Sequence, residues 1–194
     1  MDYNDLNFFR EAVSKTLSPV RAKHVLLTEK AAIELAIHYG ADVQKASVGA
    51  LLHDITKEKT VQEQLEICKK YGLVLSPLEL IETKTIHQLT GFAVAKNEYL
   101  VYDEDILNAV KHHTTARENM SLLEKIIFIA DYIEDSRDFK GVEEIRKAAF
   151  EDIDKAMLLG LSATMKKIIK KGRTLHLNTV NAYNYLIKIK QEGN

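Results

Sequence analysis

One apolar segment of the chain ends in an adjacent histidine and aspartate: Ala46-Ser47-Val48-Gly49-Ala50-Leu51-Leu52-His53-Asp54. The run of small and aliphatic side chains predicts a helix that packs against other elements. Adjacent residues on a helix point about 100° apart, because a turn holds 3.6 residues. The sequence therefore predicts that His53 and Asp54 present two polar groups in different directions from one apolar helix.

The chain on both sides of this segment also reads as helices. Apolar residues recur every three or four positions, and no strand or hairpin pattern stands out. Ser18 followed by Pro19 predicts the start of a helix, and Gly40 predicts its end. Further capping residues are expected at Thr60, Ser76, Ser121 and Asn178.

These signals predict an all-α fold of about eight to ten helices, since helices average ~10–14 residues. No repeat and no linker rich in Pro, Gly or Ser divides the 194 residues, so we expect one domain over residues 1–194. The core that carries His53 and Asp54 would span about residues 18–140, with the helices of about residues 141–194 packed on that core.

Composition excludes several classes of protein. The 27 basic and 28 acidic residues give a net charge of −1, which argues against a general nucleic-acid binder. The single cysteine, Cys68, rules out an internal disulfide framework and zinc sites of paired cysteines. The polar opening Met1-Asp2-Tyr3-Asn4-Asp5 is not a signal peptide, and no apolar run approaches the ~18 residues of a membrane span. We expect a soluble cytoplasmic protein with no membrane partner.

Histidines and aspartates carry the chemical signal. Asp131 lies in the apolar run of residues 126–133, where a carboxylate is costly to bury unless a cation or strong donors meet it. A Lys or Arg elsewhere in the chain, or a narrow solvated face, would also explain it. Imidazole and carboxylate groups suit Fe, Mn, Co or Zn, and six such groups exceed the needs of one catalytic ion. The candidate ligands of a two-metal site are His24, His53, Asp54, His87, His113 and Asp131.

The ordered set resembles the HD-domain metal-dependent phosphohydrolases, and within them the YqeK-type family of symmetrical bis(5′-nucleosyl)-tetraphosphatases. The resembling motifs span roughly residues 20–184, nearly the whole chain. They are Arg21-Ala22-Lys23-His24, Leu51-Leu52-His53-Asp54-Ile55-Thr56-Lys57, Ile86-His87 with Gly91, His113-Thr114-Thr115, Ala130-Asp131-Tyr132-Ile133-Glu134 with Arg137, and Leu175-His176 with Asn184. The resemblance implies a helical HD-domain bundle, a two-metal centre that bears iron, and the six ligands named above. His112 neighbours His113, and the Thr-Thr that follows His113 favours His113 as the ligand.

A polyphosphate substrate also needs fixed cations. Arg21 shares a helix face with His24, Lys57 lies three residues beyond Asp54, and Arg137 follows the helix of Asp131 by a short turn. We therefore expect Arg21, Lys57 and Arg137 to bind phosphate, and assign catalytic roles to Asp54, Lys57 and Arg21. Thr114 and Thr115 could donate to a phosphate or cap the next segment. His176 could lie near the substrate or have a structural role.

The basic residues between Lys166 and Arg173 are expected to be a solvated helix end. The chain departs from the family's pattern at four positions, and none of them removes a metal ligand. Gln88 replaces a Gly that often follows the third ligand, and Ala116 replaces a Gly after His-Thr-Thr. Ser136 stands where a Pro commonly precedes Arg137, and Leu177 replaces a Pro after His176.

The resemblance implies hydrolysis of a dinucleoside tetraphosphate at its middle bridge, which gives two nucleoside diphosphates. A water shared by two ions would become hydroxide at neutral pH and attack phosphorus in line with the leaving oxygen. Three alternatives stay open: a phosphatase for another nucleotide, a di-iron oxygenase and a non-catalytic nucleotide sensor. The last helix, apolar and bearing tyrosines, could pack within the monomer or form a homodimer.

Overall fold

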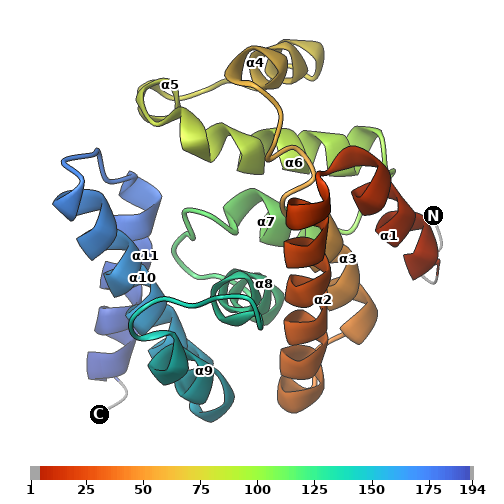
Figure 1. Cartoon of the computed structure of the whole chain (residues 1–194). Helices are drawn as coiled ribbons and strands as arrows, with labels where there is room; N and C mark the ends of the chain where they lie inside the picture. Colours follow the sequence, from red (N-terminus) through yellow and green to blue (C-terminus); the bar gives the residue numbers. More distant parts are fainter. Residues whose placement is uncertain (1–4, 193–194) are drawn as a thin grey trace.

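The computed structural model describes residues 5–192, which form eleven α-helices, one short 3-10 turn and no strand (Figure 1). The polar opening residues 1–4 and residues 193–194 lie outside this described part. The elements are α1 (Leu6–Thr16), α2 (Pro19–Tyr39), α3 (Val43–Leu52), α4 (Val61–Lys70), α5 (Pro77–Ile81), η1 (Thr83–Thr85), α6 (Ile86–Asn97), α7 (Glu104–His112), α8 (Leu122–Ile133), α9 (Val142–Glu151), α10 (Ile153–Lys170) and α11 (Leu177–Glu192).

The predicted all-α class is confirmed, although the helices of residues 5–192 outnumber the eight to ten expected. The difference arises because α5 has only five residues, and an estimate from average helix length does not anticipate so short an element. Across residues 5–192, none of the helices combines the length and apolar character that a membrane crossing requires.

Most of the predicted helix ends are confirmed. The Ser18 hydroxyl accepts a hydrogen bond from the backbone N–H of Arg21 at 3.3 Å, and Pro19 is the first residue of α2. Gly40 ends α2 with a φ of 67°, a left-handed conformation that glycine adopts without strain. Reciprocal capping boxes form at Thr60, Ser76 and Ser121.

The prediction that Asn178 caps the last helix is wrong. Because α11 already begins at Leu177, Asn178 lies inside its first turn. The backbone N–H of Asn178 instead donates to Nδ1 of His176 at 3.2 Å. The imidazole of His176, and not the side chain of Asn178, therefore accepts a hydrogen bond from the first turn of α11.

Helix α8 lies at the centre of the hydrophobic core. Its residues 126–130 are at most 1% exposed, because the helix is apolar on nearly every side. It packs against α2, α3, α7, α9 and α10. Figure 1 shows α8 nearly end-on, with α2 and α3 on one side and α10 and α11 on the other. An aspartate near the end of α8 is therefore held by a rigid, fully packed element.

The chain that follows α8 is fixed by Arg146 of α9. Its guanidinium donates to the backbone carbonyl oxygen of Ile133 at 2.9 Å, and to those of Glu134 and Arg137 at 3.0 Å each. Carbonyl groups at the end of a helix have no partner within the helix. Arg146 supplies these partners and so orders the turn that carries Glu134 and Arg137.

Replacing Arg146 by alanine should lower the free energy of unfolding by about 2 kcal/mol, because three carbonyl groups lose a charged donor. Chemical denaturation measures this change. The neighbouring Lys147→Ala is the control, since that side chain is 78% exposed and its removal should cost almost nothing. Equal unfolding free energies for the two variants would contradict the assignment.

Candidate metal centre

Six side chains from five helices and their ends meet in two groups of three. The first group joins His24 of α2, His53 at the end of α3 and Asp131 of α8. The second joins Asp54, His87 of α6 and His113 at the end of α7. Within each group the candidate ligand atoms all lie within 4.8 Å of one another. These are the six residues that the sequence pointed to.

Asp54 lies between the two groups and turns one carboxylate oxygen toward each. Its Oδ2 is 3.6 Å from Nε2 of His53 and 3.9 Å from Nε2 of His24. Its Oδ1 is 3.3 Å from Nε2 of His87 and 3.4 Å from Nε2 of His113. This arrangement matches a carboxylate that could be shared by two cations.

The four imidazole rings are held from behind through Nδ1. In His53, His87 and His113, Nδ1 lies 2.5, 2.7 and 2.7 Å from the backbone carbonyl oxygen three residues earlier. In His24, Nδ1 lies 3.1 Å from Oε1 of Glu134. Each acceptor places the ring proton on Nδ1, which leaves the lone pair of Nε2 facing the centre.

Among residues 5–192, Nε2 of His53 and Oδ1 of Asp54 are buried and have no hydrogen-bond partner. Nε2 of His24 turns its lone pair toward Oδ1 of Asp131 at 3.1 Å, so two acceptors face each other. Nε2 of His87 lies 3.0 Å from Nε2 of His113, so two more acceptors face each other beside the donors of Lys57 and Thr114. Buried acceptors in this arrangement are costly unless a cation meets them, and the set of nitrogen and carboxylate donors suits divalent transition metals. The residues therefore fit a pair of metal ions.

Burial and neighbouring charge keep these groups in the protonation states that metal binding needs. Burial lowers the pKa of His53 and of His87 to about 4, so both rings are neutral at pH 7. Burial alone would raise the pKa of Asp54, but its neighbours, the Lys57 ammonium among them, hold it well below its usual range. For Asp131, burial is likewise outweighed by its neighbours, the Arg137 guanidinium among them, and its pKa stays well below the ordinary value.

Three cationic side chains reach the two groups from the partly exposed side. Nη1 of Arg21 is 3.0 Å from Oδ2 of Asp54. Nζ of Lys57 is 3.0 Å from Nε2 of His87 and 3.7 Å from Oδ1 of Asp54. Arg137 donates from Nε to the Asp131 carbonyl oxygen at 2.7 Å and pairs through Nη2 with the carboxylate of Asp131. These side chains are 30%, 32% and 36% exposed respectively, so solvent reaches them.

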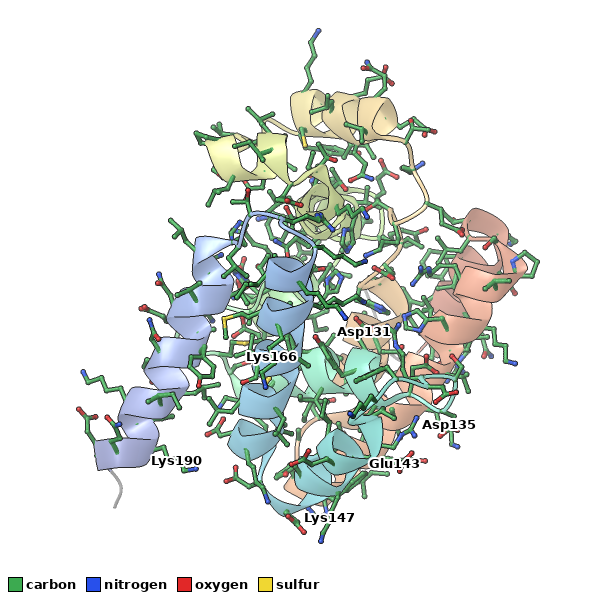
Figure 2. All side chains as sticks on the ribbon, turned by 60° about the vertical axis from the view of Figure 1, so that its left-hand side comes forward. Asp131, Asp135, Glu143, Lys147, Lys166 and Lys190 are labelled. Carbon is green, nitrogen blue, oxygen red and sulfur yellow. The ribbon has the colours of Figure 1, made fainter. Side chains whose placement is uncertain are left out.

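The side chain of Asp131 pairs with Arg137, as one of the alternative explanations from the sequence expects, and it also faces the imidazole of His24. It is 21% exposed. In Figure 2 it lies among other side chains within the bundle, whereas Glu143, Lys147 and Lys190 stand at the periphery.

Thr114 joins the cluster, and Thr115 does not. Oγ1 of Thr114 lies 3.0 Å from Nε2 of His87 and 2.9 Å from Nε2 of His113. Thr115 is 1% exposed, and its hydroxyl and backbone N–H both donate to Oε1 of Gln88 at 3.2 Å. The Thr115 hydroxyl is thus engaged in fixing the loop.

His176 also lies apart from the two groups. Its Nε2 is 3.5 Å from Oε1 of Glu79, and its Nδ1 accepts from Asn178 within α11. His112 is not a member of either group, and burial lowers its pKa to about 4. His38 is exposed and stacks edge-on against Tyr39 and Phe150.

Comparison with known proteins agrees with this geometry. The model of the HD domain family matches residues 21–136, which contain all six candidate ligands. The chain is 36% identical over 177 residues to a symmetrical bis(5′-nucleosyl)-tetraphosphatase of Bacillus subtilis, covering 90% of this chain and 94% of that protein. It is 37% identical to the protein of the same name from Halalkalibacterium halodurans, covering 91% and 94%.

The chain belongs to the HD-domain family, in the group of symmetrical bis(5′-nucleosyl)-tetraphosphatases. A crystal structure from Clostridium acetobutylicum, described as a predicted HD superfamily hydrolase involved in NAD metabolism, superimposes with a TM-score of 0.91. That protein is 44% identical in sequence, and the match covers 94% of this chain and 96% of that one.

Glu134 belongs to the motif of residues 130–134, and the sequence alone assigns it no role. It is 1% exposed, and besides its contact with His24 it accepts from the backbone N–H and the hydroxyl of Ser136 at 2.7 and 2.6 Å. Ser136 stands where the family has Pro, which has no N–H to donate. This departure therefore adds a donor to the carboxylate that orients His24.

Two other departures also lie beside the site. Gln88, in place of Gly, holds Thr115 in the loop that carries Thr114. Ala116, in place of Gly, has a φ of 57°, a left-handed conformation that costs a residue with a Cβ about 1 kcal/mol. Leu177, in place of Pro, begins α11 and is exposed.

Asp54→Asn should lose metal from both positions, because the amide removes the anionic charge that each group shares. Elemental analysis of the purified chain measures the ions retained. Asp135→Asn is the matched control, since Asp135 is 64% exposed and pairs with Lys30 of α2 at 2.7 Å. Metal retention at the wild-type level in Asp54→Asn would refute the shared carboxylate.

Glu134→Gln should weaken metal uptake at the position of His24 about 10- to 100-fold, because the ring loses a negatively charged acceptor at Nδ1. Titration of the metal-free chain with Co²⁺ measures the affinity. Glu144→Gln, at an exposed glutamate of α9, is the control. An unchanged affinity in Glu134→Gln would show that the backbone alone orients His24.

Proposed function

We propose that this chain hydrolyses dinucleoside polyphosphates, and that it converts diadenosine tetraphosphate symmetrically into two ADP. The observation that carries the proposal is Asp54, whose two oxygens face two separate groups of metal-binding side chains. The proposal is supported by relatives that carry the name symmetrical bis(5′-nucleosyl)-tetraphosphatase. The described arrangement retains all six candidate ligands, which argues against a sensor that has lost its chemistry.

His24, His53 and Asp131 would hold one ion, His87 and His113 the other, and Asp54 both. We propose iron, although Mn, Co and Zn share a preference for imidazole and carboxylate ligands. When bound, such ions make water nucleophilic at neutral pH and offset charge on phosphoryl oxygens.

Arg21, Lys57, Arg137 and Thr114 would bind the phosphate chain. In the structure their donors already point at Asp54, His87 and Asp131, so a phosphate that enters meets several donors at once. Arg21 and Arg137 can each donate two parallel hydrogen bonds to a phosphate, and Lys57 adds a point charge. Fixed donors of this kind stabilise charge that develops during phosphoryl transfer.

The leaving group in this reaction is a nucleoside diphosphate, which departs as an anion. It needs positive charge nearby more than it needs a proton donor. Lys57 and the two arginines can supply that charge from opposite sides of Asp54, since Lys57 faces its Oδ1 and Arg21 its Oδ2. No imidazole is required as a general acid. Homodimer formation and a cytoplasmic location stay predictions.

An assay of the metal-loaded chain, purified without air, tests the function. Diadenosine tetraphosphate should yield ADP as its sole product, measured by ion-exchange chromatography. ATP plus AMP would mean asymmetric cleavage and would contradict the proposal. Oxygen consumption would indicate the oxygenase, binding without turnover would indicate the sensor, and turnover of another nucleotide alone would indicate a different phosphatase.

Lys57→Ala should keep its metal but lower kcat/KM for diadenosine tetraphosphate about 100-fold or more, because one donor to the phosphoryl oxygens is lost. Steady-state kinetics and elemental analysis on the same sample separate the two effects. Lys23→Ala is the matched control, since Lys23 is an exposed lysine one residue before His24. Wild-type kinetics in Lys57→Ala would show that Lys57 does not touch the substrate.

A further inference from the structure

The connection between α10 and α11, together with the first turn of α11, is tied to the core by a set of polar contacts. We call residues 171–179 the C-terminal connection. The sequence suggested that Arg173 belongs to a solvated helix end, and this expectation is wrong. Arg173 pairs through Nη2 with Oε2 of Glu82, and the backbone N–H of Thr174 donates to Oε1 of the same carboxylate at 3.2 Å. In Figure 1 this connection lies next to α5.

Glu82 is connected through the short turn η1 to His87, one of the candidate metal ligands. It ends α5 and precedes η1, and its backbone carbonyl oxygen accepts from the N–H and the hydroxyl of Thr85 at 2.9 and 2.8 Å. Within the same turn, the carbonyl oxygen of Lys84 accepts from Nδ1 of His87 at 2.7 Å. The position of η1 therefore sets the orientation of the His87 ring.

A second contact of the C-terminal connection leads to the other histidine of that group. The hydroxyl of Thr179 donates to the backbone carbonyl oxygen of Thr115 at 2.9 Å, and both residues are at most 2% exposed. Thr115 follows Thr114, whose Oγ1 lies 2.9 Å from Nε2 of His113. The loop after α7 is thus held from outside by α11 and from inside by Gln88.

The first group is supported differently. His53 is oriented by its own helix end, His24 by Glu134, and Asp131 by Arg137 and by its place in the packed helix α8. The hydrogen bonds and ion pairs described for the C-terminal connection lead to α5 and to the loop after α7. The first segment continues through η1 to His87, and the second contains Thr114, which contacts His87 and His113.

We infer that the C-terminal connection is a brace for one of the two metal positions, with Arg173, Glu82 and Thr179 as positioning residues for His87 and His113. The inference rests on the proposed two-metal function. Residues that orient metal ligands typically change metal affinity 10- to 100-fold when they are replaced. Removal of the brace should therefore weaken one ion selectively, although no residue of the brace touches it.

The test uses the full chain, freed of metal by chelation and titrated with Co²⁺ alone, with binding followed by calorimetry and by cobalt absorption. The wild-type chain should take up two ions. Arg173→Ala and Thr179→Val should each weaken one of the two binding steps about 10-fold or more and leave the other unchanged. Arg173→Lys, which can still pair with Glu82, should restore the weakened step. Lys170→Ala, an exposed residue at the end of α10, is the control.

A second background identifies which ion is affected. His113→Ala leaves only the first group intact, so in that background Arg173→Ala should change nothing, whereas Glu134→Gln should still weaken the remaining ion. Thermal melting of each metal-free variant separates a local effect from unfolding. If Arg173→Ala fails to fold, Thr179→Val carries the test.

Each outcome decides the question. Equal weakening of both steps, or none, in a wild-type chain that binds two ions would overturn the brace and leave the proposed function standing. A wild-type chain that takes up no cobalt would overturn both, and this result is recognised without any variant.

Discussion

The carboxylate of Asp54 is buried among four imidazole rings, and the other parts of the site must offset the cost of burying this negative charge. An anion removed from water costs several kcal/mol unless partners replace its hydration. The four rings cannot do so as donors, because acceptors behind each ring fix its proton on Nδ1 and turn a lone pair inward. Arg21 and Lys57 compensate from the open side only. Cations between the carboxylate and the rings would complete the balance, and the convergence of five helices at one point fits such a site.

The two groups share one kind of position, since His53 and His113 each stand at the end of a helix, and they differ in the structure that carries their other histidine. Asp131 comes from α8, the most deeply packed helix, and His24 from α2, which has 21 residues. His87 lies in the first turn of α6 after a three-residue 3-10 turn, and His113 caps the end of α7. Helix ends and short turns open at lower free energy than packed helix interiors. The group of His87 and His113 therefore depends more on contacts from elsewhere in the chain.

This difference also explains what could be predicted from the sequence. Helix ends such as Ser18 and Gly40 follow from local chemistry, and the ligands could be found because His53 and Asp54 are adjacent and the remaining ones lie in recognisable motifs. The role of Arg173 could not be predicted, because its partner Glu82 is 91 residues away and both look like ordinary surface charges in the sequence. The predicted number of helices is too low for a related reason. Helix α5 has only five residues, and it is stabilised by a capping box and by contacts with the rest of the chain.

The departures from the family's pattern show that a substitution can be interpreted only together with its contacts. In the sequence, Ser136 and Gln88 are departures that remove no metal ligand. In the structure, Ser136 donates twice to the carboxylate that orients His24, and Gln88 both accepts from and donates to Thr115. Ser136 fixes its turn by hydrogen bonds, whereas a Pro would restrict the backbone itself. Gln88 fixes its loop with a side chain, which a Gly would lack. A metal centre of this kind constrains the position of its ligands closely, but leaves open which interactions hold them there.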